Sequence, residues 1–133
     1  EQECADPVVI FMPEGSKTHM GGTMRLGARR TVMQTTNCQT CKLYGGVKEF
    51  DERHRHRYEV NVSYVPSMEK KGLEFVGKDT TGERMEVLEL RDHPYFVAAQ
   101  YHPEFKSRPL KPSPLFYGLI CAASGIKPEY TPA

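Results

Sequence analysis

The sequence predicts one domain that combines β-strands with α-helices, and three segments carry that prediction. Residues 8–12 form a continuous apolar run rich in β-branched side chains, which is typical of a short buried strand. The runs 73–78 and 85–90 flank the turn sequence Asp-Thr-Thr-Gly at 79–82, which predicts a β-hairpin. Residues 113–125 repeat apolar side chains at helical spacing, which predicts a helix. No linker-like stretch divides the 133 residues into two domains.

The remaining elements follow from turn residues and local periodicity. The last helix is predicted to begin after Ser113, a good N-cap, with Pro114 at its first position and Gly125 at its C-terminal end. Residues 14–22 mix Gly, Ser, Thr and His without periodicity, which is typical of a loop. The other predicted elements are a strand within 23–34, a short helix or turn within 36–46, one helical turn in 67–72 and a strand in 95–100.

The composition is that of a soluble globular protein. Hydrophobic residues make up 38% and charged residues 26% of the chain, and the formal net charge is +1. So small a net charge creates no field that would attract nucleic acid, and no apolar run approaches the roughly 18 residues of a membrane helix. The first residues lack the basic and apolar regions of a secretory signal. We therefore expect a cytoplasmic protein with neither nucleic acid nor a membrane as its partner.

The four cysteines favour free thiols over disulfides or a metal site. The chain is too poor in Cys for a disulfide-stapled scaffold. Cys38 and Cys41 form a Cys-x-x-Cys pair, which is half of a zinc site, but no second pair follows. His54 and His56 lie among arginines that repel a cation. No metal is therefore expected.

Arginine and histidine alternate over residues 53–57. If this segment is extended, its period of two places the arginines on one face. Such a face suits a carboxylate or phosphate, which the Arg fork binds in bidentate fashion. A solvated, charged edge strand is the other interpretation, and the residues by themselves favour it.

His102 and Glu104 follow directly on the predicted strand 95–100. In an extended stretch these two side chains point to the same side, so the carboxylate can orient the imidazole and stabilise the imidazolium. The free ring nitrogen can then act as a general base for a nucleophile from elsewhere. A half-buried histidine in a turn beside a solvated glutamate is the alternative, and spacing alone favours it.

Taken together, the segments resemble one family. The chain is similar, from about residue 8 to 124, to the C-terminal part of the class I glutamine amidotransferase domain of CTP synthases. His-Pro-Glu at 102–104 is shared by class I amidotransferases generally, whereas two longer strings are more specific. The matching strings are Gly-Gly-Thr-Met-Arg-Leu-Gly at 21–27, Glu-Arg-His-Arg-His-Arg-Tyr-Glu-Val-Asn at 52–61, His-Pro-Tyr-Phe-Val at 93–97, Gln-Tyr-His-Pro-Glu-Phe at 100–105, Ser-Arg-Pro at 107–109 and Pro-Ser-Pro-Leu-Phe at 112–116.

The resemblance implies a fold and a set of site residues. The fold is an α/β, class I glutamine amidotransferase-like one, with a mostly parallel central sheet and an added antiparallel portion, and residues 1–133 are the C-terminal portion of that domain. His102 corresponds to the base of a Cys-His-Glu triad and Glu104 to its orienting partner. Arg57 corresponds to the arginine that holds the glutamine α-carboxylate, and Tyr58 lines the same pocket.

The resemblance also implies a reaction and its participants. CTP synthases are ligases of pyrimidine biosynthesis that make CTP from UTP, ATP and glutamine with Mg²⁺, and ammonia passes from the glutaminase domain to a synthase domain. The loop 14–22 matches the lid associated with activation by GTP. The parent enzyme is expected to be a homotetramer that binds ATP and other nucleotides, while this piece by itself is expected to bind no cofactor.

One departure from the family pattern bears on activity. The family's nucleophile lies on a Gly-x-Cys-x-Gly elbow upstream of every matching string, and none of the four cysteines here has that context. The isolated chain is therefore expected to be inactive, with exposed apolar surface where the rest of the domain would pack. Another class I amidotransferase is disfavoured by the Arg-His-Arg-His-Arg-Tyr string. A non-catalytic regulatory or interaction fragment is the remaining alternative.

Overall fold

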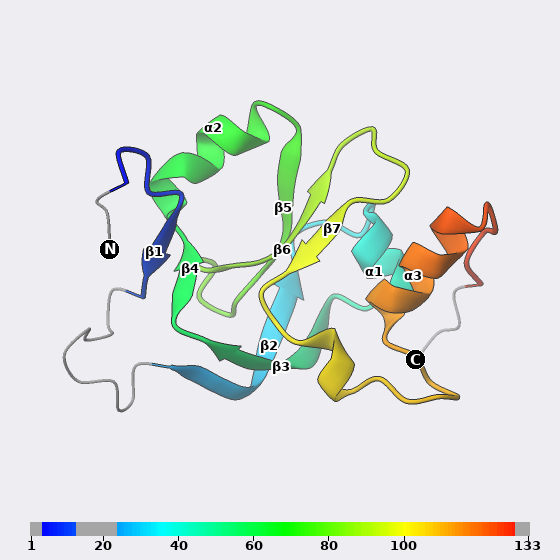
Figure 1. Cartoon of the computed structure of the whole chain (residues 1–133). Coiled ribbons are helices and arrows are strands. Elements are labelled where there is room, and N and C mark those ends of the chain that lie inside the picture. Colours follow the sequence, from blue (N-terminus) through cyan, green and yellow to red (C-terminus); the bar gives the residue numbers. More distant parts are fainter. Residues whose placement is uncertain (1–3, 13–23, 130–133) are drawn as a thin grey trace.

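The computed structural model describes residues 4–12 and 24–129, and two antiparallel sheets organise this part of the chain. The larger sheet has five strands in the order β3-β2-β5-β6-β7, and the smaller one pairs β1 with β4 (Figure 1). Helices α1 and α3 lie together at one end of the large sheet, and β1, β4 and α2 lie at the other. The elements are β1 Val9–Phe11, β2 Arg25–Met33, α1 Gln39–Leu43, β3 Glu49–His56, β4 Tyr58–Val60, the 3₁₀ helix η1 Val62–Tyr64, α2 Val65–Glu69, β5 Leu73–Lys78, β6 Met85–Leu90, β7 Val97–Ala99, the 3₁₀ helix η2 Pro103–Phe105 and α3 Pro114–Ala123.

The alternation of arginine and histidine is confirmed as a strand with two different faces. β3 pairs with β2 in a register that runs from Arg25 opposite His56 to Val32 opposite Glu49. Along β3, Arg53 is exposed whereas His54 is buried, and the arginines share the solvent face as the period of two predicts. The strand ends at His56, so Arg57 lies in the bend between β3 and β4.

The predicted hairpin is confirmed, with the predicted strand bounds. The buried Asp79 closes its turn: its carboxylate accepts hydrogen bonds from the Thr81 hydroxyl at 2.8 Å and from the backbone N–H of Arg84 at 3.1 Å. Burial acts to raise the pKa of Asp79, but these hydrogen bonds outweigh it and hold that pKa below its ordinary value. Gly82 completes the turn with a φ of 78°, which a side chain would disfavour.

The last helix is also confirmed, and its packing explains one glycine. Ser113 occupies the N-cap position of α3 and Pro114 follows it, although the Ser113 hydroxyl makes no capping hydrogen bond. A Cβ added to Gly118 would lie 2.5 Å from Leu43 Cδ1 and 2.9 Å from Tyr95 Cε2. The absence of a side chain there lets α3 approach α1 closely.

One buried cluster joins the sheet to both helices and reaches the predicted catalytic loop. Its last sheet-side member is Tyr101, which is 3% exposed and immediately precedes His102. The packed core therefore holds the start of that loop in place. The cluster consists of Met33, Cys38, Cys41, Val76, Val87, Tyr101 and Leu115.

The structure corrects two expectations about the sheets. Residues 8–12 were predicted to form a buried strand, but β1 pairs only with β4 and its Val9 is 60% exposed. A mostly parallel central sheet was expected, but every strand pair in the described part of the chain is antiparallel. Parallel neighbours need a long crossover, whereas the connections from β5 to β6 and from β6 to β7 are too short for one. The connection from β2 to β3 contains α1 and is long enough, but these strands also pair antiparallel. This part of the fold is thus the antiparallel portion.

The expected exposed apolar surface is present on α3. Phe116, Leu119 and Ile120 recur at helical spacing and are each more than two-fifths exposed. No helix among the described residues is both long enough and apolar enough to cross a bilayer. The predicted loop 14–22 lies outside the described residues.

Candidate active site

The structure brings His102 and Glu104 into direct contact. The two residues flank Pro103 at the start of η2, and His102 Nδ1 lies 2.8 Å from Glu104 Oε1. An ionised carboxylate only accepts hydrogen bonds, so Nδ1 carries the hydrogen and Nε2 keeps its lone pair. The hydrogen bond from His102 lowers the pKa of Glu104 below its ordinary value. This arrangement leaves Nε2 free to accept a proton.

Two further contacts, one through the backbone and one through the ring, hold His102 in place. The His102 backbone N–H donates to the carbonyl of Arg53 on β3 at 2.8 Å, which ties the loop to the sheet. The ring also stacks on Phe105, with centroids 4.8 Å apart and an interplanar angle of 17°. The His102 side chain is 37% exposed, so it is anchored and still accessible.

Arg57 and Tyr58 form a corner where the chain leaves β3 and enters β4, and they lie near the same loop. The Arg57 carbonyl accepts the backbone N–H of Met12 at 2.9 Å, and the Tyr58 ring meets Phe11 edge-on at 5.4 Å. The Tyr58 carbonyl accepts a hydrogen bond from Gln100 Nε2 at 3.2 Å, and Gln100 lies two residues before His102. The fold thus connects the predicted glutamine contacts to the predicted base.

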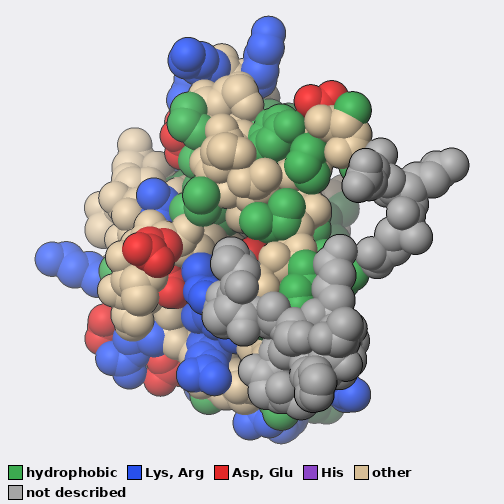
Figure 2. Space-filling model, turned by 90° about the vertical axis from the view of Figure 1, so that its left-hand side faces the viewer, with side chains coloured by type: hydrophobic (Ala, Val, Ile, Leu, Met, Phe, Trp, Pro, Cys, Tyr) green, Lys and Arg blue, Asp and Glu red, His purple; other side chains and the backbone are tan. Residues whose placement is uncertain are grey.

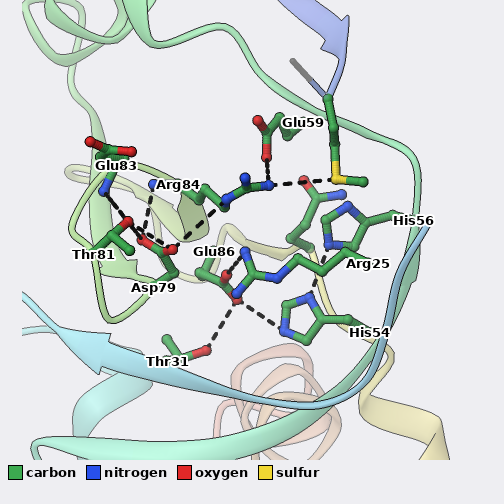
Figure 3. Close-up of polar contacts among 12 residues, drawn as sticks. Arg25, Thr31, His54, His56, Glu59, Asp79, Thr81, Glu83, Arg84 and Glu86 are labelled. Carbon is green, nitrogen blue, oxygen red and sulfur yellow. Dashed lines mark hydrogen bonds and ion pairs between the residues drawn. The ribbon is translucent and has the colours of Figure 1, made fainter. Parts of the chain in front are cut away.

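A buried polar network behind this corner was missed by the sequence analysis. Glu86 on β6 lies at the centre of this network and is 2% exposed. Arg25 Nη1 lies 2.8 Å and His54 Nε2 lies 3.0 Å from the Glu86 carboxylate (Figure 3). His54 continues to His56, whose pKa is lowered to about 4 by burial and then by the charge of His54. The alternation along residues 53–57 indicated that both histidines face away from the arginines, but nothing marked Glu86 as their partner.

A second buried network lies at the start of the loop that carries His102. The Tyr44 hydroxyl donates to Glu52 Oε1 at 3.0 Å and lies 3.1 Å from the Tyr101 hydroxyl. Burial raises the pKa of Glu52, and Lys106, 3.9 Å away, opposes that rise. Because Tyr101 precedes the base, this network helps to fix where the loop begins.

Cys38 and Cys41 are structural thiols in this fold. Cys38 is the N-cap of α1 and its sulfur accepts the Cys41 N–H at 3.3 Å. Burial raises the pKa of Cys38 to about 11, and the nearby Glu89 carboxylate adds to that rise. All four cysteines are free, and no cluster of three metal-ligating side chains occurs in residues 4–12 and 24–129.

The basic residues of β2 line a hollow of about 590 Å³, and most of their charge is already paired. Arg25 binds Glu86, while Arg30 binds Glu49 at 2.7 Å and Asp51 at 2.9 Å. Figure 2 shows Lys and Arg side chains near the centre and lower left of the face that it draws, with Asp and Glu side chains among those at the lower left.

A comparison with family models decides the classification. The model of the class I glutamine amidotransferases matches residues 2–122. The chain belongs to this family. Curated relatives include CTP synthase 1-B of Xenopus laevis, 59% identical over 124 residues, and CTP synthase 1 of Homo sapiens, 56% identical over 124 residues; each alignment covers 93% of this chain and 21% of the relative. The CTP synthase of Schizosaccharomyces pombe is 52% identical over 132 residues, which cover 98% of this chain and 22% of the relative.

A solved structure confirms the class I amidotransferase-like fold. The glutaminase domain of a Trypanosoma brucei CTPS, with bound acivicin, superposes with a TM-score of 0.86 at 32% identity. The match covers 96% of this chain and 49% of that one. The chain spans about a fifth of the length of the curated relatives it matches and about half of this solved domain.

Proposed function

We propose that this chain is the C-terminal portion of the glutaminase domain of a CTP synthase. In this role His102 and Glu104 are two members of a Cys-His-Glu triad, and Arg57 and Tyr58 bind glutamine. The observation that carries the proposal is the 2.8 Å contact between His102 Nδ1 and Glu104, which leaves Nε2 accessible on a loop tied to the Arg57–Tyr58 corner. The similarity to CTP synthases supplies the substrate.

The proposed chemistry has His102 take up and return one proton in each half of the reaction. Nε2 takes the proton of a cysteine thiol, and the thiolate attacks the side-chain carboxamide carbon of glutamine. When the tetrahedral intermediate collapses, the imidazolium gives its proton to the leaving amide nitrogen, ammonia departs and a thioester remains. His102 then takes a proton from water, whose oxygen attacks the thioester. The second intermediate releases glutamate and the cysteine sulfur, which regains its proton from the imidazolium. Glu104 stabilises the imidazolium in both halves of the reaction.

The nucleophile is proposed to come from another segment of the parent protein. Cys38, Cys41 and Cys121 are buried, Cys4 is exposed, and none of the four has the flanking glycines of a nucleophile elbow. Burial with a raised pKa is the reverse of what an attacking thiolate requires. We therefore infer that residues 1–133 alone do not hydrolyse glutamine.

Arg57 is proposed to hold the α-carboxylate of glutamine, and Tyr58 to line the same pocket. The Arg57 Nε atom is buried and has no hydrogen-bond partner in the described part of the chain. The unused Nε–H suits a carboxylate, which a guanidinium binds through two parallel hydrogen bonds.

The other participants are proposed from the similarity to CTP synthases. The ammonia is used by a synthase domain of the same cytoplasmic, homotetrameric protein to convert UTP to CTP, with ATP and Mg²⁺ bound in that other domain. Activation by GTP is assigned to the segment 14–22. No residue of the described chain is proposed to bind these nucleotides or the metal.

The test is ammonia release from glutamine by the full-length protein. We expect His102→Ala to lower kcat by at least about a thousandfold, since a triad base is lost. Arg57→Ala should instead raise the KM for glutamine. CTP formation with ammonium salt in place of glutamine should survive both substitutions. Full activity of the His102→Ala variant would refute the assignment of the base.

A non-catalytic regulatory or interaction fragment is the second candidate. The exposed face of Phe116, Leu119 and Ile120 on α3 favours it, because such a face suits a protein partner. The retained contact between His102 and Glu104 argues against it, since an inactive module needs neither side chain. A full-length protein that releases no ammonia from glutamine would favour this candidate.

A further inference from the structure

Glu86, His54 and His56 form a continuous row of polar side chains (Figure 3). Glu86 and His54 are buried and His56 is partly buried, and the row ends on the backbone of the Arg57–Tyr58 corner. His54 Nε2 lies 3.0 Å from Glu86 Oε2, and His54 Nδ1 lies 3.0 Å from His56 Nε2. His56 Nδ1 lies 3.0 Å from the Tyr58 carbonyl oxygen. The row therefore runs from the middle of the large sheet to the candidate glutamine pocket through three contacts of hydrogen-bond length.

These contacts require one proton more than two neutral imidazoles carry. The Tyr58 carbonyl only accepts, so His56 Nδ1 must carry a hydrogen, and His56 Nε2 then accepts from His54 Nδ1. The contact of His54 Nε2 with Glu86 is an ion-pair approach and not a well-aligned hydrogen bond, but a bare lone pair 3.0 Å from an ionised carboxylate would be repelled, so Nε2 carries a hydrogen as well. The two rings then hold three hydrogens, whereas two neutral rings hold two.

The groups around the row favour placing the extra proton on His54. The Arg25 guanidinium, from β2, and the Thr31 hydroxyl contact the Glu86 carboxylate at 2.8 and 3.3 Å, which keeps it an acceptor. The buried Glu52 and the edge of the Tyr101 ring, 5.9 Å away between centroids, also lie near His54. A cation at His54 and the cation of Arg25 both lie against the Glu86 carboxylate.

The row of polar side chains ends at the Tyr58 carbonyl, where the candidate site begins. The Tyr58 carbonyl has two lone pairs, and they accept from His56 Nδ1 and from Gln100 Nε2. The first contact fixes the end of β3, and the second fixes the residue that leads to His102. A shift of this one carbonyl would thus move Arg57 relative to the base.

We propose that Glu86, His54 and His56 are positioning residues for glutamine binding, acting through the Tyr58 carbonyl. The inference rests on the proposed function, because it takes the Arg57–Tyr58 corner as the glutamine contact. None of the three side chains is proposed to touch the substrate.

The first test separates binding from chemistry in the full-length protein. His56→Ala removes the contact with His54 and the contact with the Tyr58 carbonyl. We therefore expect the KM for glutamine to rise about three- to tenfold while kcat changes less than about twofold. In His56→Asn the side-chain amide lies near the Nδ1 position, so it still donates to the Tyr58 carbonyl and should recover most of the wild-type KM. His93→Asn, a histidine substitution in the exposed turn before β7, is the matched control and should leave both constants unchanged.

The second test needs no activity. The Met12 N–H that donates to the Arg57 carbonyl should exchange for deuterium several times faster in His56→Ala than in the wild type, as measured by mass spectrometry of the peptide that contains it. Unchanged exchange would overturn the positioning role even in an inactive protein. Faster exchange with an unchanged KM would instead refute Arg57 and Tyr58 as the glutamine contact, and an inactive wild type would refute the proposed function itself.

Discussion

Replacing Glu86 with glutamine should destabilise the fold far more than the same replacement at Glu74, although both residues lie in one hairpin. Glu86 is 2% exposed and its carboxylate contacts Arg25, His54 and Thr31. The glutamine amide keeps the volume and one acceptor, but it leaves two buried cationic groups without a counter-charge. Removal of one partner from a buried ion pair costs about 3–5 kcal/mol, which is a large part of the roughly 5–15 kcal/mol that stabilises a typical domain.

Glu74 on β5 supplies the matched control. It pairs with Arg91, and both side chains are about half exposed, so solvent screens that pair. Urea unfolding followed by far-UV circular dichroism and by tyrosine fluorescence measures both variants, since the chain has seven tyrosines and no tryptophan. The midpoint should fall strongly for Glu86→Gln and barely for Glu74→Gln, with similar slopes. Equal effects of the two substitutions would refute the argument that burial makes the Glu86 network a stability determinant.

Two further predictions concern the thiols and the catalytic pair. At pH 8, Cys4 should be alkylated at least about ten times faster than Cys38, because burial hinders access to Cys38 and raises its pKa to about 11. Peptide mass spectrometry measures both rates, and equal rates would contradict the buried position of Cys38. The lowered pKa of Glu104 means that its contribution to stability is present above the ordinary carboxyl range and is lost as pH falls through the lowered value. An NMR titration of the Glu104 carboxyl should therefore give a midpoint below 4.5 that returns toward 4.5 in His102→Ala, and an unchanged midpoint would show that His102 is not its partner.

Features that depend on local sequence were predicted well. The hairpin of β5 and β6 and the helix α3 follow from turn residues, caps and periodicity, which act within a few residues. The contact between His102 and Glu104 is also local, because only two residues separate the side chains. Recognition of the family rested on such contiguous strings, and the family model and the similar glutaminase domain confirm it.

The exposed position of β1 and the direction of strand pairing were not predictable in the same way. An apolar run such as residues 8–12 is equally compatible with a central strand and with one that has a single neighbour. That choice depends on which other strand is available. Among the described residues β1 pairs only with β4, where Phe11 lies opposite Tyr58, 47 residues further along the sequence.

The sequence by itself determined the hairpin, the last helix, the two faces of β3 and the local pairing of His102 with Glu104. Only the tertiary structure decided that Glu86 lies against His54, that Gln100 binds the Tyr58 carbonyl, and that the candidate base therefore shares one edge with the candidate glutamine contacts. The physical reason is that these groups are 32 and 42 residues apart in sequence. Their contacts arise from the register of whole strands, which depends on many side chains packing together.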